Sequence, residues 1–373
     1  MRALVTGGLG FIGCNLADCL LRDGHDVVIY DNASRFGVME NLEWLRRRHG
    51  GAVNWIRGDT REAASVVIAM KDADVVFHFA AQVAVTTSVA NPREDFEVNA
   101  LGTINVLEAA RQLTPPPVVL YTSTNKVYGG LEGIEVFEDE TRYRLGPGFL
   151  GGIPETFPLD FHSPYGCSKG AADQYVRDYY RIYGLPTVVF RMSCIFGRHQ
   201  MGNEDQGWVA HLARTVLEGG EVRIFGDGKQ VRDLLYADDL VEAMLKAVNR
   251  IDRTAGQVYN LGGGPANTIS VWAELQAVLA DLVDDVPEAR FGPWRPGDQR
   301  IYISDICKVR EHLDWAPQVT IAEGLQRMIE DWEASGVARP VADRIVSPAV
   351  ILSAPERCGA SSRRPNGRGG GDV

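Results

Sequence analysis

The chain has 373 residues, of which 45% are hydrophobic, enough for one large domain or two medium-sized ones with a sizeable core. Its formal net charge is −11, and no basic run lies in the part expected to fold, so nucleic acid is not expected as a partner. No apolar run reaches the length that spans a membrane, and the N-terminus enters a strand pattern directly, so we expect no membrane partner and no signal peptide. The six cysteines lack the C-x-x-C spacing of metal or redox pairs, which favours packing residues in a cytoplasmic protein without a metal site.

A glycine-rich turn joins the first expected strand, residues 2–6, to a helix with apolar periodicity over residues 11–21. The turn reads G-x-x-G-x-x-G. Gly7 permits the tight turn, Gly10 lets the backbone approach a pyrophosphate, and Gly13 lets the helix pack on the strand. The phosphates would lie at the positive N-terminus of the helix. The residues predicted to surround them are Gly7, Gly10, Phe11, Ile12 and Gly13.

An acidic residue stands where the second strand, residues 26–30, ends. Asp31 lies eighteen residues after Gly13, and its carboxylate can accept hydrogen bonds from the adenosine ribose while repelling a 2′-phosphate, so the pattern favours NAD over NADP. A third strand, residues 53–57, is followed by Asp59, whose carboxylate could meet the adenine amino group. The adenosine end of NAD is therefore assigned to Asp31, Asn32 and Asp59.

The fourth strand, residues 75–79, is fully apolar and is therefore expected to be central and parallel. It runs into small residues at the carboxyl end of the sheet, where ligands of such folds bind. A long helix after Pro92, reaching about Leu113, carries Asn99. Hydroxyl groups before this helix either face a sugar or cap the helix. These segments add Ala80, Ala81, Gln82 and Asn99 to the predicted cofactor site, and Thr86 and Ser88 to the predicted substrate site.

The fifth strand, residues 118–122, leads into Thr124 and Asn125. A hydroxyl at the carboxyl end of a strand is well placed to hydrogen-bond a substrate oxygen, so both residues are assigned to the site. The stretch 130–161 that follows is rich in Gly, Pro and acidic residues. Loops of this length inside a compact domain are usually functional or mobile, and this one delivers the chain to a Y-x-x-x-K pair.

Tyr165 and Lys169 stand four residues apart at an expected helix start, where Ser163 can act as N-cap and Pro164 suits the first helical position. Residues i and i+4 share a helix face, so we expect the ammonium of Lys169 close to the phenol of Tyr165. A free phenol has a pKa near ~10, and a nearby ammonium, together with any cation bound beside it, favours the phenolate. The pair predicts a base that takes a proton from a sugar hydroxyl while hydride leaves the same carbon.

Beyond the sixth strand, residues 187–192, the regular alternation ends. Two basic turns carry Arg232 and Arg295, which either hold a diphosphate by bidentate contacts or pair with neighbouring acids. Ser193, directly after the strand, is a further predicted substrate residue.

The alternation of strands and helices predicts an α/β fold, a Rossmann-type doubly wound parallel sheet with a smaller C-terminal α/β region that binds the substrate. We assign residues 1–192 to the NAD-binding domain with the catalytic residues. Residues 193–336 belong mostly to the substrate-binding region, with some segments returning to the first domain. Residues 337–373 are rich in Pro, Arg, Ser and Gly and are expected to form a disordered tail.

The motifs along the chain come in the order found in the extended short-chain dehydrogenase/reductases. They are the glycine turn, Asp31, Ala80-Ala81, Ser123-Thr124 and the pair Tyr165 and Lys169. Over residues 1 to about 332 the chain resembles the nucleotide-sugar epimerase group of that family, which implies NAD as cofactor and a nucleotide sugar as substrate. By this resemblance the catalytic residues are Thr124, Tyr165 and Lys169, Lys169 also contacts the nicotinamide ribose, and Arg232 and Arg295 hold the substrate diphosphate.

The residues after the catalytic threonine narrow the resemblance. In 4,6-dehydratases an Asp-Glu pair supplies the acid and base of water elimination there, whereas Asn125 and Lys126 cannot, so dehydration is not expected. Residues 122–129, 159–174, 205–208 and 228–233 are similar to enzymes that invert C2 of a CDP-linked deoxyhexose, of the paratose and tyvelose type, through a transient 2-keto sugar. A 4-epimerase and an NAD(P)H-dependent nucleotide-sugar reductase remain as alternatives, and the intact catalytic set argues against a non-enzymatic dinucleotide-binding module.

A homodimer or homotetramer is also expected. The two long helices expected over about residues 95–113 and 164–183 would supply its seam with their outer faces. An apolar stripe on those faces would support such a seam, and the alternative is a pair of ordinary surface helices.

Overall fold

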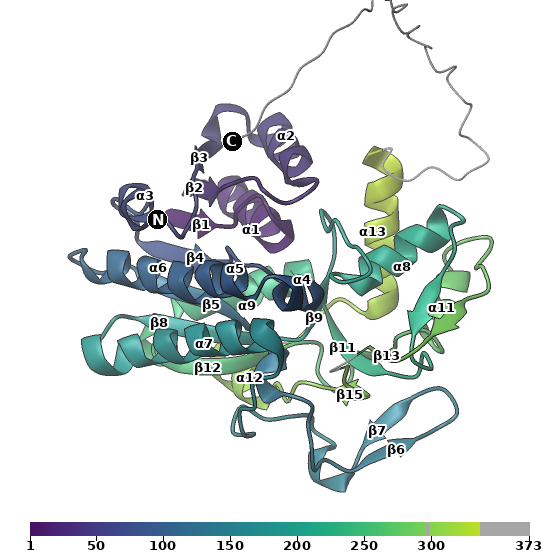
Figure 1. Ribbon diagram of the computed structural model, residues 1–373. Coiled ribbons are helices and arrows are strands. Elements are labelled where there is room, and N and C mark those ends of the chain that lie inside the picture. Colours follow the sequence, from purple (N-terminus) through teal and green to yellow (C-terminus); the bar gives the residue numbers. More distant parts are fainter. Residues whose placement is uncertain (296–297, 336–373) are drawn as a thin grey trace, which may run out of the picture.

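The computed structural model describes residues 1–295 and 298–335, and Figure 1 shows their arrangement. A main sheet with helices on both faces lies beside a smaller group of strands and helices from the C-terminal half of the chain. The tail predicted over residues 337–373 lies outside the described residues.

Seven parallel strands form the main sheet, in the order β3-β2-β1-β4-β5-β8-β12. The order reverses between β1 and β4, and ligands of open parallel sheets bind beyond the carboxyl ends of the strands at such a point. This topology confirms the predicted Rossmann-type α/β fold. The strands are β1 (Arg2–Thr6), β2 (Asp26–Asp31), β3 (Asn54–Arg57), β4 (Val75–His78), β5 (Val118–Thr124), β8 (Thr187–Met192) and β12 (Gln257–Leu261).

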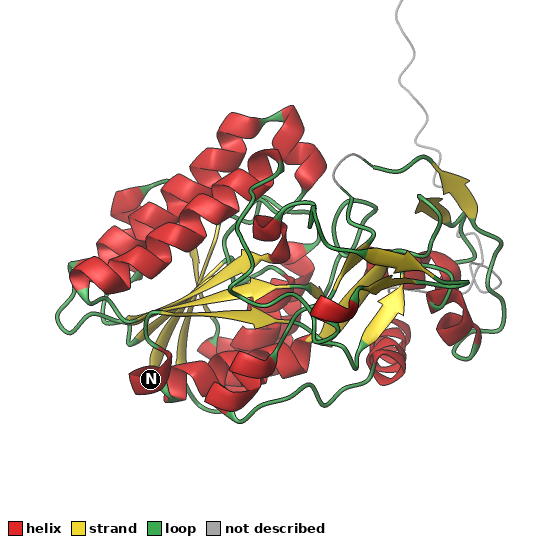
Figure 2. Cartoon of the chain, turned by 90° about the horizontal axis from the view of Figure 1, so that it is seen from below, coloured by secondary structure: helices red, strands yellow, loops and turns green. Residues whose placement is uncertain are grey.

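Helices cover both faces of this sheet, and Figure 2 shows the sheet between the two layers. One layer holds α1 (Phe11–Arg22), α2 (Val38–His49), α9 (Ala237–Asn249) and α12 (Cys307–Leu313), and the other holds α3 (Ala63–Ala69), α6 (Gly102–Arg111) and α7 (Ser163–Tyr183). Successive residues of a strand point to opposite faces, so Val5 enters the core under α1 and Leu4 enters the core under α6. Burial on both faces explains why the strands are nearly continuous apolar runs.

The long helix expected after Pro92 forms, and it contains a π-helical turn. The chain forms α4 (Val85–Ala90), α5 (Pro92–Phe96), a π-helical turn η2 (Glu97–Leu101) and then α6, which ends at Arg111. A π-helical turn accommodates a local widening of the helix and is frequent at functional sites. This one carries Asn99, whose amide contacts the loop after β4.

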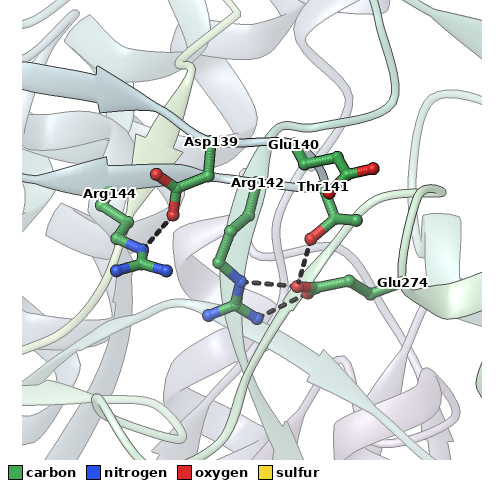
Figure 3. A pocket seen from close by; sticks show the side chains of 6 residues that line it. All are labelled: Asp139, Glu140, Thr141, Arg142, Arg144 and Glu274. Atoms are coloured by element: carbon green, nitrogen blue, oxygen red, sulfur yellow. Dashed lines mark hydrogen bonds and ion pairs between the residues drawn. The ribbon is translucent and has the colours of Figure 1, made fainter.

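Residues 130–161, expected as a functional or mobile loop, contain secondary structure of their own. Strands β6 (Val136–Glu138) and β7 (Tyr143–Leu145) form an antiparallel hairpin, followed by a short turn η4 (Pro147–Phe149). Arg142 holds this hairpin to the C-terminal region through a bidentate ion pair with Glu274, at 2.6 and 2.5 Å (Figure 3). A polar pocket of about 550 Å³ opens beside the pair, and none of its lining residues belongs to the predicted site. The lining residues are Asp139, Glu140, Thr141, Arg142, Arg144 and Glu274.

The C-terminal region has a core of its own, formed by two small sheets and their helices. The central strand is β11, which pairs with three others, and β10 pairs with β14. The strands are β9 (Cys194–Phe196), β10 (Arg223–Phe225), β11 (Val231–Tyr236), β13 (Thr268–Ser270), β14 (Arg290–Gly292) and β15 (Ile301–Tyr302). The helices are α8 (Trp208–Leu217), α11 (Leu275–Ala280) and α13 (Ile321–Ser335), whereas the short helix α10 (Ile251–Thr254) packs on the core of the main sheet.

Within residues 1–295 and 298–335, no helix is both long and apolar enough to cross a membrane. No group of three or more His, Cys, Asp or Glu side chains in this part is placed to hold a metal ion. Its five cysteines are free thiols.

Candidate active site

The glycine turn after β1 packs against the end of β4 so closely that side chains are excluded. A Cβ on Gly7, whose φ is +66°, would lie 2.7 Å from the backbone nitrogen of Ala80. A Cβ on Gly13 would lie 2.4 Å from the carbonyl oxygen of Gly7. The following helix α1 has Gly10 at its N-cap without a side-chain hydrogen bond, so its first N–H groups face outward from the sheet end. Such a helix N-terminus fits a pyrophosphate.

Asp31 ends β2 beside this turn and holds it in place. Its carboxylate accepts hydrogen bonds from the N–H groups of Leu9 at 3.1 Å and Ala33 at 2.8 Å. Burial raises the pKa of Asp31, and these two hydrogen bonds oppose the rise. The predicted ribose ligand is therefore also a structural link between the glycine turn and the second strand.

The carboxylate of Asp59, predicted to meet the adenine, is already hydrogen-bonded within the chain. The guanidinium of Arg61 donates to its two oxygens at 3.0 and 2.7 Å, and Asn32 donates to it at 2.9 Å. These bonds, the side-chain bonds of Arg61 first, lower the pKa of Asp59 to about 2. Asn32 and Asp59 lie together, as expected for residues of one site, and their side chains are hydrogen-bonded to each other.

A buried polar network joins the loop after β4 to α7. The backbone of Gln82 exchanges hydrogen bonds with the amide of Asn99, at 2.9 and 3.0 Å. The carboxylate of Asp95 accepts bonds from Gln82 Nε2 at 2.8 Å, from Asn99 Nδ2 at 3.1 Å and from the hydroxyl of Ser168. Asn99 and Gln82 were predicted as cofactor residues, whereas Asp95 and Ser168 were not singled out. The i, i+4 spacing of Asp95 to Asn99 and the place of Ser168 beside Lys169 were the available signals.

The start of α7 is held by two serines. Ser163 Oγ accepts a hydrogen bond from the Gly166 N–H at 3.3 Å, although α7 begins at Ser163 and its N-cap position is His162 rather than the expected Ser163. Ser88 Oγ accepts from the Tyr165 N–H at 3.1 Å and donates to the Val85 carbonyl at 2.7 Å, and its side chain is fully buried. Ser88 therefore positions Tyr165, and the expectation that its hydroxyl faces a sugar was wrong because both of its bonding directions are used inside the protein.

Tyr165 and Thr124 meet at the carboxyl end of β5. Their hydroxyl groups are hydrogen-bonded, and this bond lowers the pKa of Tyr165, while the larger effect of burial raises that pKa to about 12. Thr124 Oγ1 also accepts the Lys126 N–H at 3.2 Å and lies 3.4 Å from Asn125 Oδ1. The predicted oxygen-binding hydroxyl and the predicted base are thus in direct contact.

Lys169 lies on the same helix as Tyr165, but its ammonium is hydrogen-bonded to a backbone carbonyl group. Its ammonium donates to the Thr122 carbonyl oxygen at 2.6 Å and lies 4.3 Å from the ring centre of Tyr121. Burial lowers the pKa of Lys169 to about 7, while Asp173 and Asp95 oppose this change. The expected net lowering of the Tyr165 pKa is therefore absent from the chain alone, because burial raises this pKa more than the hydrogen bond with Thr124 lowers it.

The other predicted substrate residues differ in exposure and bonding. Thr86 is exposed on α4, and Asn125 is buried beside Thr124. The hydroxyl of Ser193 donates to the buried carboxylate of Asp233. Substrate binding by Ser193 would have to use its oxygen as an acceptor.

Both arginines predicted to hold a diphosphate are paired with acids. Arg232 donates to Asp298 at 2.8 Å, and its side chain is almost fully buried. Arg295 lies 3.8 Å from the carboxylate of Glu204 and 3.5 Å from that of Asp205. In the unliganded chain both arginines therefore form ion pairs within the protein. A diphosphate would displace these carboxylates or share the arginines with them.

Sequence comparison with known proteins supports this arrangement. The chain is 43% identical over 342 residues to the CDP-paratose 2-epimerase of Salmonella typhi, covering 90% of this chain and 100% of that protein. It is 34% identical over 331 residues to the UDP-glucose 4-epimerase of Mycolicibacterium smegmatis, covering 88% of this chain and 98% of that protein. Both relatives span nearly the whole described chain.

Solved structures agree with the fold. The UDP-glucose 4-epimerase of Thermotoga maritima with UDP-glucose matches with a TM-score of 0.78 and 31% identity, over 90% of this chain and 99% of that chain. The UDP-glucose 4-epimerase of Thermus thermophilus in complex with NAD matches with a TM-score of 0.75 and 31% identity, over 90% of this chain and 100% of that chain.

The family model described as "NAD dependent epimerase/dehydratase family" matches residues 3–262. This match confirms the resemblance to nucleotide-sugar epimerases and the prediction of NAD as cofactor. With the glycine turn, the paired Thr124 and Tyr165 and the seven-stranded sheet in place, the chain belongs to the NAD dependent epimerase/dehydratase family.

Proposed function

We propose that the protein is an NAD-dependent epimerase that inverts C2 of a CDP-linked deoxyhexose through a transient 2-keto sugar. The observation that carries the proposal is the hydrogen-bonded pair of Thr124 and Tyr165 beside the glycine turn, followed by Asn125 and Lys126. This pair can remove and return the proton of a carbinol hydroxyl, and the residues after it cannot eliminate water. The 43% identity to a CDP-paratose 2-epimerase supports the choice of C2.

The residues around the glycine turn fit NAD, because a Cβ at Gly7 or Gly13 would collide with backbone and the turn stays open to a pyrophosphate. Bound NAD supplies reversible acceptance of a hydride. We assign its pyrophosphate and adenosine to the ends of β1 and β2, and its nicotinamide end to the region of β4, β5 and α7. The proposed cofactor residues are Gly7, Gly10, Phe11, Ile12, Gly13, Asp31, Asn32, Asp59, Ala80, Ala81, Gln82, Asn99, Tyr165 and Lys169.

Tyr165 takes the proton of the C2 hydroxyl as hydride leaves C2, and Thr124 stabilises the ketone oxygen by a hydrogen bond. Arg232 and Arg295 hold the diphosphate while the 2-keto sugar turns. Hydride then returns to the other face of C2, and Tyr165 gives the proton back. Because the chain alone holds the pKa of Tyr165 at about 12, its phenolate needs the positive charge of the oxidised nicotinamide and of Lys169 together.

Isotope retention tests this function. A CDP-linked paratose or tyvelose that carries deuterium at C2 should be interconverted with the label kept at C2 of the product, without added NADH. Release of the label into solvent would indicate enolisation and contradict hydride return. Inversion at C4 in place of C2 would identify a 4-epimerase, and consumption of NADH in proportion to product would identify a reductase.

Oligomeric state, domain roles and location complete the proposal. Exposed apolar side chains on α5, η2 and α7 favour a homodimer, or a homotetramer built from it; they are Phe96, Leu101, Tyr175, Ile182 and Tyr183. We propose residues 1–192 as the NAD-binding domain and residues 193–336 as mostly the substrate-binding region. The free thiols of the described part suit a reducing cytoplasm.

A further inference from the structure

Lys126 lies in a rigid turn directly after the catalytic threonine. The turn η3 (Asn125–Tyr128) follows β5, and the Lys126 N–H is bonded to Thr124 Oγ1 at 3.2 Å. Val127 and Tyr128 are fully buried, and the Tyr128 hydroxyl donates to Asn260 Oδ1 at 2.7 Å. Because the turn is anchored at both ends, the position of the Lys126 side chain relative to Thr124 is determined by the fold.

The ammonium of Lys126 shares a region with another cation and one carboxylate. Arg232 and Asp298 are its strongest charged neighbours, and Asp298 already accepts a hydrogen bond from Arg232 at 2.8 Å. Burial first, and then Arg232, lowers the pKa of Lys126 to about 8. Among residues 1–295 and 298–335, no acceptor is bonded to this ammonium. Two cations thus share one carboxylate in a partly buried region, and an anionic ligand would balance them.

The position of this excess charge bears on which carbon reacts. Thr124 binds the oxygen of the reacting carbon in the proposed function, and Lys126 follows two residues later. In a nucleotide sugar, C2 is bonded to C1, the carbon that carries the phosphate, whereas C4 lies across the ring from it. The N–H of Lys126 is bonded to the Thr124 hydroxyl, so this cation belongs to a residue at the reaction centre. That suits C2 chemistry, in which the sugar-side phosphate lies next to the reacting carbon.

We propose that Lys126 binds the sugar-side phosphate of the substrate and thereby places C2, instead of C4, at Thr124 and Tyr165. This inference rests on the proposed function and adds a specificity-determining residue to it. Arg232 lies on the other side of the same anion and completes its binding.

Binding of CDP and CMP to the NAD-loaded full-length protein tests the proposal. The terminal phosphate of CDP takes the place of the sugar-side phosphate, and CMP lacks it. Lys126→Met should weaken CDP binding about tenfold or more and leave CMP binding unchanged, because one charge-assisted hydrogen bond is lost. Lys126→Arg should keep most of the preference for CDP, and Lys71→Met, which removes an exposed lysine on another surface, should behave as wild type.

The outcomes separate this inference from the proposed function. Unchanged CDP binding in Lys126→Met, or equal weakening of CDP and CMP, would overturn the role of Lys126 even if the wild type inverts C2. A wild type that inverts C4 in the isotope experiment refutes the proposed function and the choice of carbon together. Retained CMP binding shows that the variant is folded.

Discussion

The hydroxyl of Ser168 donates a hydrogen bond to the buried carboxylate of Asp95, and this contact joins the helix of Tyr165 to the segment that carries Asn99. Ser168 is also bonded to the Asn99 amide at 3.0 Å. Because Ser168 precedes Lys169 directly, the network sets the position of the catalytic helix against the loop after β4. The site is therefore positioned by polar contacts as well as by the apolar core.

Replacing Asp95 by Asn tests this network. The carboxylate accepts from three donors, and an amide would present its own NH₂ group to at least one of them. We expect Asp95→Asn to lower the free energy of unfolding by about 1–3 kcal/mol, the usual effect of a buried unpaired polar group. Urea unfolding measures the change. Glu97→Gln, at a partly exposed i, i+4 pair with Arg93, is the control and should change stability by less than about 0.5 kcal/mol; equal effects of the two substitutions would count against the network.

Replacing Gly13 by Ala tests the glycine turn. The new Cβ would meet the Gly7 carbonyl at 2.4 Å and the Gly8 Cα at 2.5 Å, and backbone atoms cannot move aside without opening the turn. We expect loss of bound NAD and a lower melting temperature. Gly51→Ala, where the Cβ meets no atom within 4 Å, should keep both properties. Full NAD content in the Gly13 variant, measured after denaturation, would show that the turn does not hold the pyrophosphate.

Replacing Tyr165 by Phe tests the proposed base. The substitution removes the hydroxyl that carries the proton but keeps the ring, so we expect turnover to fall about 10²- to 10⁴-fold with NAD still bound. Turnover of the CDP-linked sugar and the NAD content of the purified protein are the two measurements. Tyr180→Phe, at a tyrosine of the same helix that is 40% exposed, should leave turnover unchanged. Activity near the wild-type level in Tyr165→Phe would exclude Tyr165 as the base.

His78 predicts a pH dependence of stability. The ring is buried at the end of β4 between the hydroxyls of Thr6 at 2.7 Å and Thr103 at 3.0 Å, and burial, assisted by Lys169, lowers its pKa to about 3. Below its ordinary pKa of 6.5 the unfolded chain takes up a proton that the folded chain does not. Stability is therefore fully present above pH 6.5 and is lost as the pH falls toward 3, by at most about 1.4 kcal/mol per pH unit from this group.

The change of the free energy of unfolding with pH tests this role of His78. Urea unfolding between pH 6.5 and about pH 5 should show a shallower pH dependence in His78→Gln than in the wild type, whatever the absolute stability of the variant. Parallel slopes in the two proteins would mean that His78 is protonated in the folded state.

Replacing Ile182 by Glu tests the oligomer. Ile182 is 65% exposed on the outer face of α7, next to Tyr183, and a carboxylate in a buried seam would be strongly unfavourable. We expect the wild type to sediment as a dimer or tetramer and Ile182→Glu to sediment as a smaller species. Ile68→Glu places the same charge on α3, where Ile68 is 72% exposed, and should not change the mass. A monomeric wild type would refute the seam.

The sequence by itself determined the order of strands and helices, the class of fold and the dinucleotide turn. These features depend on local patterns: apolar runs make the buried strands, and Gly7 and Gly13 are required wherever backbone packs on backbone. The sequence also predicted Thr124 and Tyr165 as residues of one site, whereas their hydrogen bond was seen only in the structure.

Only the tertiary structure decided which partner each polar side chain takes. Ser88 bonds the backbone of Tyr165, Lys169 bonds the carbonyl of Thr122, and Asp95 bonds Ser168, although these pairs are 77, 47 and 73 residues apart in the chain. The physical reason is burial: once a group is removed from water it must bond to whatever the packing brings near, and the same removal sets its pKa. Spacing along the chain contains no information on that neighbour, so it predicted the catalytic residues but not the bonds that hold them.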